Sequence, residues 1–302
     1  MRKLEIITIK DSKYPKQLKN IKNPPKMIYA EGNIELLNSN IISIIGSRVC
    51  SENGIELAQK FAKDLVYQDI TIASGMAVGI DTVAHKATLQ EKGKTIAVLG
   101  NGLKNIFPKE NIDLFHKIIN QGGLVISEYP PKEKANSNHF LERNRIVSGI
   151  SLGVLVIEAA HRSGTSVTAK LALEQGKKIF AIPHEINDLH GVGTNRLIKK
   201  GAKIVTTTED IINEFPFLTY KTPPKNRLRK LEQNPISERK KCTNKKYNEI
   251  YKFIKEKPIS LEEIYQRSNK EVSEINQILL ILELEGYIEK VVGGYKCILE
   301  KK

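Results

Sequence analysis

Between residues 41 and 214, short apolar runs alternate with longer segments whose apolar residues follow helical spacing. The runs are continuous rather than alternating, which indicates strands that are covered by helices on both faces. Ser51 can cap a helix after the first run, and one face of that helix carries Ile55, Ala58, Ala62 and Leu65. The pattern therefore predicts a doubly wound, mostly parallel α/β domain. Its expected strands are 41–45, 70–74, 95–99, 123–127, 152–157, 178–182 and, more weakly, 203–206.

The segments on either side of this domain have different patterns. Residues 1–40 form a short lead-in with Pro-containing turns and a predicted edge strand at Met27–Ala30. Residues 216–246 combine prolines with dense Lys and Arg, which is typical of a flexible basic linker. The predicted organisation is a lead-in at 1–40, an α/β domain at 41–215, a linker at 216–246 and a small domain at 247–302.

The last segment has the pattern of a winged helix. A helical stretch over 247–257 ends at Pro258, and Ser260 with Glu263 begins the next helix as a capping box. A third helix spans Ser273–Glu285. Two short strands around Gly293-Gly294 complete the domain. The third helix carries Glu274, Glu283 and Glu285 and no Lys or Arg, so it is poorly suited to contact phosphates.

The chain has more Lys and Arg than Asp and Glu, and this excess is unevenly distributed along the sequence. The chain of 302 residues has 40% hydrophobic and 27% charged residues and a formal net charge of +14. Residues 221–246 carry ten Lys and Arg against Glu232 and Glu238, whereas 247–302 are nearly neutral. A basic balance indicates a polyanionic partner, although a lysine-rich surface that only confers solubility is an alternative interpretation.

Other classes of protein find little support in the sequence. No stretch approaches the length of about 20 apolar residues that a membrane span needs, and the N-terminus lacks the apolar segment of a signal peptide. Three separated cysteines, without metal-site spacing, are expected to be reduced thiols. The sequence predicts a cytoplasmic protein with no metal, no cofactor, no catalytic residues and no membrane partner.

Four predicted strands end in turns rich in Gly, Ser and Arg. In an open parallel sheet such turns converge on one crevice, where small residues and helix N-termini can receive an anion. No Gly-Lys-Ser/Thr follows the first turn and no G-x-G-x-x-G follows any strand, which disfavours ATP and dinucleotides. The sequence predicts a phosphate-binding crevice built from Gly46, Ser47, Arg48, Ser74, Gly75, Arg143, Asn144, Arg145, Ser163, Gly164, Thr165 and Lys170.

Each of these motifs also has a structural interpretation. The turn with Arg48 can be an ordinary surface turn, and Ser163-Gly164-Thr165 can simply cap a helix. Phe140 can stack a base or belong to the core. Asp81 and His85, four residues apart, could form an acid/base pair, but a helix-dipole role for Asp81 is favoured.

The order of these motifs resembles the DNA-processing protein A family (DprA, also called Smf). The resemblance runs from Tyr14-Pro15 to residue 215 and on through the winged helix, and rests on GSR, SGxAxGID..AH, TIAVLGxGL, SEYP, FxxRNRI, SGTxxTA and GTNxLIxxGA. It implies an extended Rossmann-like domain that binds single-stranded DNA, dimerises and helps to load the RecA recombinase during natural transformation.

The resemblance also implies roles for individual residues. Arg48 and the turn of Ser74 and Gly75 would contact phosphate, Phe140 would stack a base, and Arg143 and Arg145 would shape the pocket. Its far wall would be lined by Ser163, Gly164, Thr165 and Lys170. The chain departs from the family pattern where Val78 replaces an arginine, Leu141 replaces a proline and His184 replaces a glycine.

An enzyme or sensor for a small nucleotide is the alternative function. Phosphoribohydrolases with a similar crevice carry a PGGxGTxxE signature, but Thr168 stands here at the glutamate position.

Overall fold

The computed structural model describes residues 4–160, 164–222, 247–256, 258–268, 270–284, 287–291 and 293–297. The chain divides into two compact units, Met1–Thr222 and Pro223–Lys302. The predictions for Ser163, for Cys242 (one of the three cysteines) and for most of the linker concern residues outside the described ones. No helix in the described part of the chain is long and apolar enough to cross a membrane.

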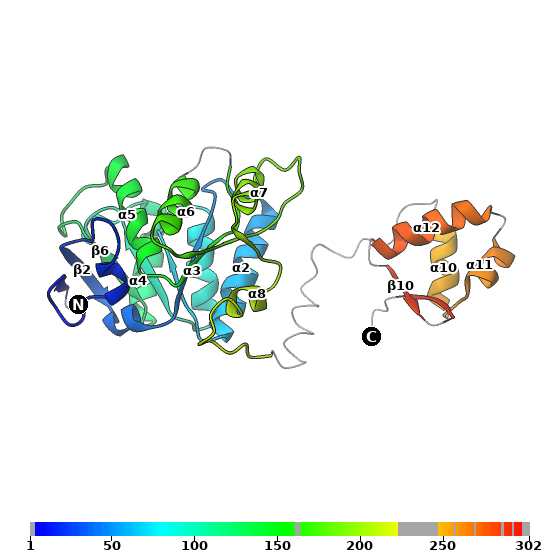
Figure 1. The fold of residues 1–302 in the computed structure, drawn as a ribbon, viewed down its shortest axis with the longest axis horizontal. Coiled ribbons are helices and arrows are strands. Elements are labelled where there is room, and N and C mark those ends of the chain that lie inside the picture. The colour runs from blue at the N-terminus through cyan, green and yellow to red at the C-terminus, as the bar shows by residue number, and fades with distance from the viewer. Residues whose placement is uncertain are drawn as a thin grey trace. The chain divides into compact units, whose positions relative to one another are not determined.

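The first unit is built on a nine-stranded sheet with the order β1-β2-β6-β5-β4-β3-β7-β8-β9 (Figure 1). Strands β3 to β9 are parallel, whereas β2 pairs antiparallel with both β1 and β6. The strands are β1 (Glu5–Thr8), β2 (Met27–Gly32), β3 (Ile41–Ile45), β4 (Thr71–Ser74), β5 (Thr95–Leu99), β6 (Leu124–Ser127), β7 (Gly153–Val156), β8 (Lys178–Ala181) and β9 (Lys203–Ile204).

Helices cover both faces of this sheet. They are α1 (Lys16–Lys19), α2 (Glu52–Tyr67), α3 (Ile80–Gln90), α4 (Ile112–Asn120), α5 (Ser137–Gly149), α6 (Gly164–Glu174), α7 (Val192–Lys199) and α8 (Thr208–Ile212), with 3₁₀ turns at Ile34–Asn38 and Lys109–Asn111. On β3, Ile41 and Ile45 belong to the core on the α5 and α6 side, and Ile42 and Ile44 to the core with α2 and α3. The predicted doubly wound α/β class is therefore confirmed.

Two predicted boundaries differ from the structure. The lead-in contributes β1 and β2 to the sheet, so the predicted edge strand at Met27–Ala30 lies second from the edge. Residues 216–222 pack on the α/β unit instead of starting a linker, because the side chain of Gln68 pairs with the backbone of Lys221 at 2.7 and 2.9 Å. The sequence could not show this, since polar side-chain contacts with a distant backbone leave no periodic pattern.

The second unit has the order of a winged helix. Its elements are α10 (Asn248–Glu256), α11 (Leu261–Arg267), α12 (Val272–Leu284), β10 (Ile288–Val291) and β11 (Gly294–Cys297). Ser260 caps α11 by accepting a hydrogen bond from the Glu263 N–H at 3.2 Å. A separate core of Ile and Leu side chains holds these elements together. The predicted winged helix is confirmed.

Candidate nucleic-acid interface

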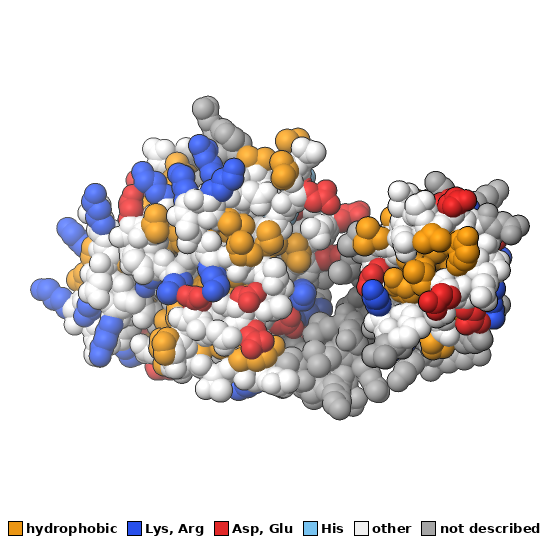
Figure 2. Space-filling model, turned by 45° about the vertical axis from the view of Figure 1, so that its right-hand side comes forward, with side chains coloured by type: hydrophobic (Ala, Val, Ile, Leu, Met, Phe, Trp, Pro, Cys, Tyr) orange, Lys and Arg blue, Asp and Glu red, His pale blue; other side chains and the backbone are white. Residues whose placement is uncertain are grey.

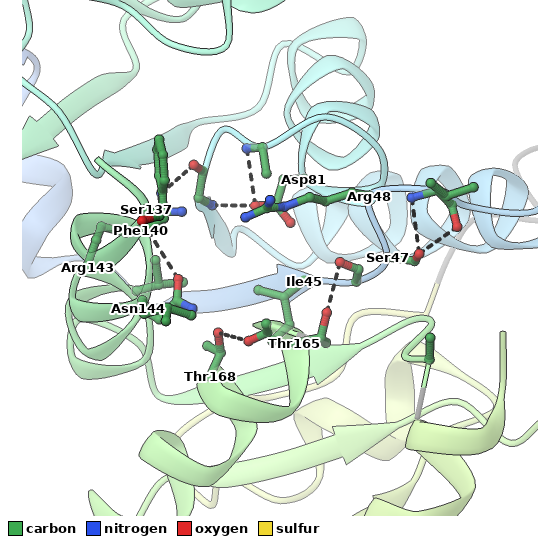
Figure 3. Close-up of a pocket in the computed structure, with 18 of the residues that line it drawn as sticks. Ile45, Ser47, Arg48, Asp81, Ser137, Phe140, Arg143, Asn144, Thr165 and Thr168 are labelled. Carbon is green, nitrogen blue, oxygen red and sulfur yellow. Dashed lines mark hydrogen bonds between the residues drawn. The ribbon is translucent and has the colours of Figure 1, made fainter. Parts of the chain in front are cut away.

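A cavity of about 930 Å³ opens at the carboxyl ends of the parallel strands, where the strand order reverses between β3 and β7. Open α/β sheets bind ligands at this switch point. Turns after β3 and β4 line the cavity together with α5 and the start of α6 (Figure 3). Of the predicted residues, the cavity brings together Gly46, Ser47, Arg48, Gly75, Phe140, Arg143, Asn144, Gly164 and Thr165.

The turn after β3 presents Arg48. The backbone of this turn is tied to the start of α3, because the Ile80 N–H donates to the Ser47 carbonyl at 3.1 Å. Gly79 makes this approach feasible: its φ is +84°, and a Cβ there would lie 2.3 Å from the same carbonyl. Arg48 itself is exposed and extends toward the middle of the cavity (Figure 3). No carboxylate among the described residues lies within ion-pair distance of it.

The N-terminus of α2 is occupied by an internal carboxylate. Glu158, which is fully buried, accepts hydrogen bonds from both the N–H and the hydroxyl of Ser51. The Ser51 hydroxyl in turn accepts from the Gly54 N–H at 3.0 Å. Because a helix N-terminus attracts anions, Glu158 stands where a bound phosphate could otherwise lie.

A second carboxylate, in the first turn of α3, takes the same role for the turn that precedes this helix. Asp81 accepts hydrogen bonds from the N–H groups of Gly75, at 3.0 Å, and Ala77, at 3.4 Å. Burial raises the pKa of Asp81, and the nearby Arg143 guanidinium and these hydrogen bonds counteract that shift. These two N–H groups of the turn thus have an acceptor from within the protein.

Asp81 and His85 do not share a proton path. His85 is fully buried, its Nδ1 lies 2.7 Å from the Thr95 hydroxyl, and burial lowers its pKa to about 3. It does not line the cavity. The geometry supports the structural interpretation, in which Asp81 stabilises the start of α3 and His85 belongs to the core.

Arg143 lines the floor of the cavity and is almost completely buried there. Only 4% of it is exposed, and its Nη1 donates to the carbonyls of Gly75 and Val98. Burial lowers its pKa to about 10, an effect that Asp81 partly offsets. A Cβ at Gly75 would lie 2.7 Å from the guanidinium, so the glycine lets the arginine pack under the turn. Arg143 therefore supports the floor of the cavity.

Three other predicted residues lie outside the cavity lining. Ser74 is buried and donates to the Ile44 carbonyl at 2.7 Å. Arg145 pairs with Glu128 at 2.6 Å, and Lys170 lies 3.8 Å from Glu174 on the exposed side of α6. Their predicted contacts with DNA stay predictions.

The start of α6 adjoins the turn of Arg48 and lines the cavity beside it. The Thr165 hydroxyl donates to the Gly46 carbonyl at 3.0 Å, and Thr168 donates to the Gly164 carbonyl at 3.3 Å. A Cβ at Gly164 would meet no atom within 4 Å, so the space beside this residue is open. Within the described residues, no carboxylate hydrogen-bonds to Gly164 or Thr165.

Sequence reasoning missed two residues that shape the site. Phe107, from the loop after β5, lines the cavity, and Glu158 controls the start of α2. An aromatic residue beside Pro108 in a loop that follows a strand was the available signal for the first. A buried glutamate directly after a strand was the signal for the second.

A metal centre would need a cluster of His, Cys, Asp or Glu side chains. Over the residues that the structure describes, no group of three or more His, Cys, Asp or Glu side chains could hold a metal ion. The cavity lining instead combines the exposed Arg48, the first residues of α6 and apolar walls, a set that is chemically suited to an anion carrying an apolar group. The fold and the site thus define a Rossmann-like α/β protein with an arginine-containing crevice at its switch point.

Comparison with known proteins identifies the family. Residues 5–216 match the family model described as DNA recombination-mediator protein A, and residues 238–294 match that of the DprA winged helix domain. Protein Smf of Escherichia coli K12 is 38% identical over 93% of this chain and 74% of its own length. The DNA processing protein DprA of Streptococcus pneumoniae R6 is 42% identical over 71% of this chain and 76% of its own. The chain belongs to the DprA/Smf family.

Two solved structures agree with this assignment. The X-ray structure of DprA from S. pneumoniae has a TM-score of 0.67 at 42% identity and covers 71% of this chain and 75% of that one. A structure of DNA processing protein A from Helicobacter pylori, whose single-stranded DNA binding mode it reports, has a TM-score of 0.63 at 30% identity. It covers 71% of this chain and 97% of that one.

Proposed function

We propose that this protein binds single-stranded DNA in the switch-point cavity without catalysing a reaction on it. The observation that carries the proposal is the exposed Arg48, which has no carboxylate of the described residues at ion-pair distance and lines a cavity with apolar walls together with the start of α6. A backbone phosphate fits the cation and the helix N-terminus, and bases fit the apolar walls. The single-stranded DNA binding reported for the H. pylori relative supports the same ligand.

The residues divide into two roles under this proposal. Gly46, Ser47, Arg48, Gly164 and Thr165 contact the phosphates, while Gly75, Arg143 and Asn144 maintain the floor of the cavity. The nucleotide-hydrolase alternative gains no support, because Thr168 stands at the glutamate position and its hydroxyl donates a hydrogen bond to the Gly164 carbonyl.

The wider role that we propose is the transfer of incoming single strands to a RecA-type recombinase in the cytoplasm by a homodimer, as in natural transformation. Membership of a family of recombination mediators supports it. For the winged helix we propose a protein-contact role. Helix α12 contains no Lys or Arg. The exposed Tyr265, Val272 and Leu280 belong to this unit, on which Figure 2 shows a hydrophobic group beside acidic side chains.

The test is an electrophoretic shift with single- and double-stranded DNA of equal length over a salt series. We expect a preference for single strands and an affinity that falls with salt at a slope of about −0.7 per phosphate neutralised. Arg48→Ala should flatten this slope by about one phosphate contact. Lys94→Ala is the matched control, because it removes one charge at the amino end of β5, away from the cavity.

The same assay tests the winged-helix proposal with a chain that ends at Thr222, which should retain most of the affinity for single strands. Salt-independent binding, or no binding of oligo-dT, would contradict the proposed function. A large loss of affinity on truncation would contradict only the role given to the winged helix.

A further inference from the structure

We propose that the outer face of Phe107 is a base-stacking position of the cavity; this inference rests on the proposed function and refines it. Phe107 lines the cavity and is 46% exposed, which is a large exposed apolar surface for a ring next to an anion site. Single-stranded nucleic acids are bound in this way, with phosphates on cations and bases on aromatic faces.

The packing of Phe140 shows which ring is available. The centroids of Phe107 and Phe140 are 5.6 Å apart, with an angle of 38° between the rings. A base inserted between two rings needs about 7 Å, twice the contact distance of about 3.5 Å. The two rings are therefore in contact with each other and leave no room for a base between them, so a base that stacks on Phe107 does so on the side that faces away from Phe140.

Phe140, which lies on α5, also packs against a neighbouring turn of the protein. A Cβ at Gly100 would lie 2.7 Å from Cδ1 of Phe140, so the ring packs closely on the turn after β5. In this arrangement Phe140 acts as a support for Phe107, and the exposed ring offers the stacking surface.

The loop that carries Phe107 is held in place by its own hydrogen bonds. The Asn101 side chain donates to the Asn105 carbonyl at 2.6 Å, and the Lys104 N–H donates to the Pro131 carbonyl at 2.8 Å. The Asn105 side chain donates to the Lys132 carbonyl. Phe107 is thus presented to solvent by an anchored loop, so little ordering of the ring is needed when a base binds.

Phe217 provides a comparison within the same unit. It is 65% exposed and contacts Phe215 at a centroid distance of 5.9 Å and an angle of 48°, much as Phe107 contacts Phe140. Phe217 does not line the cavity. The two exposed rings contact a second phenylalanine in a similar way, but only Phe107 lines the cavity. Phe217 is therefore a matched control.

The chain contains no tryptophan, so a single Trp reports on either position. The experiment compares full-length Phe107→Trp and Phe217→Trp, titrated with oligo-dT and with an abasic oligonucleotide of the same length. Stacking should quench the Phe107→Trp fluorescence saturably with oligo-dT and much less with the abasic strand. Phe217→Trp should not respond. Thermal unfolding and an electrophoretic shift verify folding and binding for each variant.

A second arm measures affinity with Phe107→Leu, which keeps apolar bulk but removes the aromatic face. We expect the affinity for oligo-dT to fall by about five- to a hundredfold, the range for loss of one stacked base, and the affinity for the abasic strand to change little. Oligo-dT binding by Phe107→Trp without quenching, or equal loss for both strands with Phe107→Leu, would overturn this inference alone. No binding of oligo-dT by the wild-type chain would overturn the proposed function as well.

Discussion

Helices α2 and α3 differ from α6 in what lies at their N-termini. Buried carboxylates, Glu158 and Asp81, accept hydrogen bonds at or just before the starts of the first two. At α6 the space beside Gly164 is open, and no carboxylate among the described residues hydrogen-bonds to its first residues. The glycine-rich turns of this sheet are therefore not equivalent receptors: all three line the cavity, but two already hold a carboxylate of the protein, and at the third no carboxylate of the described residues does so.

The arginines follow the same division. Arg143 is buried beside Asp81 and donates to backbone carbonyls, whereas Arg48 is exposed in the cavity. One cation maintains the architecture and the other is available to a ligand. Substitutions can separate these two functions, because stability should depend on the inner layer and DNA affinity on the outer one.

The largest expected effect is on the stability of Arg143→Met. Removing the guanidinium leaves the buried Asp81 without its cation and deletes the hydrogen bonds of Arg143 to two carbonyls, which should lower the free energy of unfolding by about 3–5 kcal/mol. Arg48→Ala should change it by less than about 0.5 kcal/mol. Urea unfolding of both variants measures the difference. Equal unfolding midpoints would contradict the assignment of a structural role to Arg143 and a ligand-binding role to Arg48.

The next effect concerns the buried histidine of α3. The pKa of His85 is about 3 in the folded protein, against about 6.5 for an ordinary histidine. Below pH 6.5 the unfolded chain binds a proton that the folded protein does not, so stability falls as the pH decreases toward 3. The contribution is about 1.4 kcal/mol per pH unit. Asp81, whose pKa is raised, acts in the opposite direction.

The measurement is the free energy of unfolding at pH 7, 6 and 5 for wild type and two variants. His85→Gln should weaken the loss of stability toward low pH, while His116→Gln, at an exposed position, should keep the wild-type slope. The contribution of Asp81 is common to all three proteins, so the difference between slopes reports His85. Parallel slopes for His85→Gln and wild type would contradict a neutral, buried His85.

The sequence predicted the elements of the fold far better than the roles within the site. Continuous apolar runs located β3 and β5 to the residue, because a buried strand needs apolar side chains on both faces. Whether an arginine is buried or exposed leaves no such pattern. Arg143 and Arg145 looked alike in sequence, yet one packs under Gly75 and the other pairs with Glu128. Such partners come from distant segments and appear only in three dimensions.

The smallest effect is expected from substituting two glycines, one near the start of α2 and one at the start of α6, and it tests the difference between these two helix N-termini. A Cβ at Gly54 would lie 2.3 Å from the Glu158 carboxyl group, whereas one at Gly164 would meet nothing. Gly54→Ala should therefore cost about 1–3 kcal/mol of stability through overpacking and leave the DNA affinity of the folded protein unchanged. Gly164→Ala should keep or raise stability by up to about 1 kcal/mol, through its higher helix propensity.

DNA binding should respond in the opposite order. The methyl group of Gly164→Ala enters the open space where we place a phosphate, so we expect a several-fold weaker affinity for oligo-dT. Unfolding midpoints and electrophoretic shifts on the same two preparations check this crossed pattern. If Gly54→Ala weakened DNA binding as much as Gly164→Ala did, the start of α2 would also receive a phosphate, and Glu158 would have to be displaced when the strand binds.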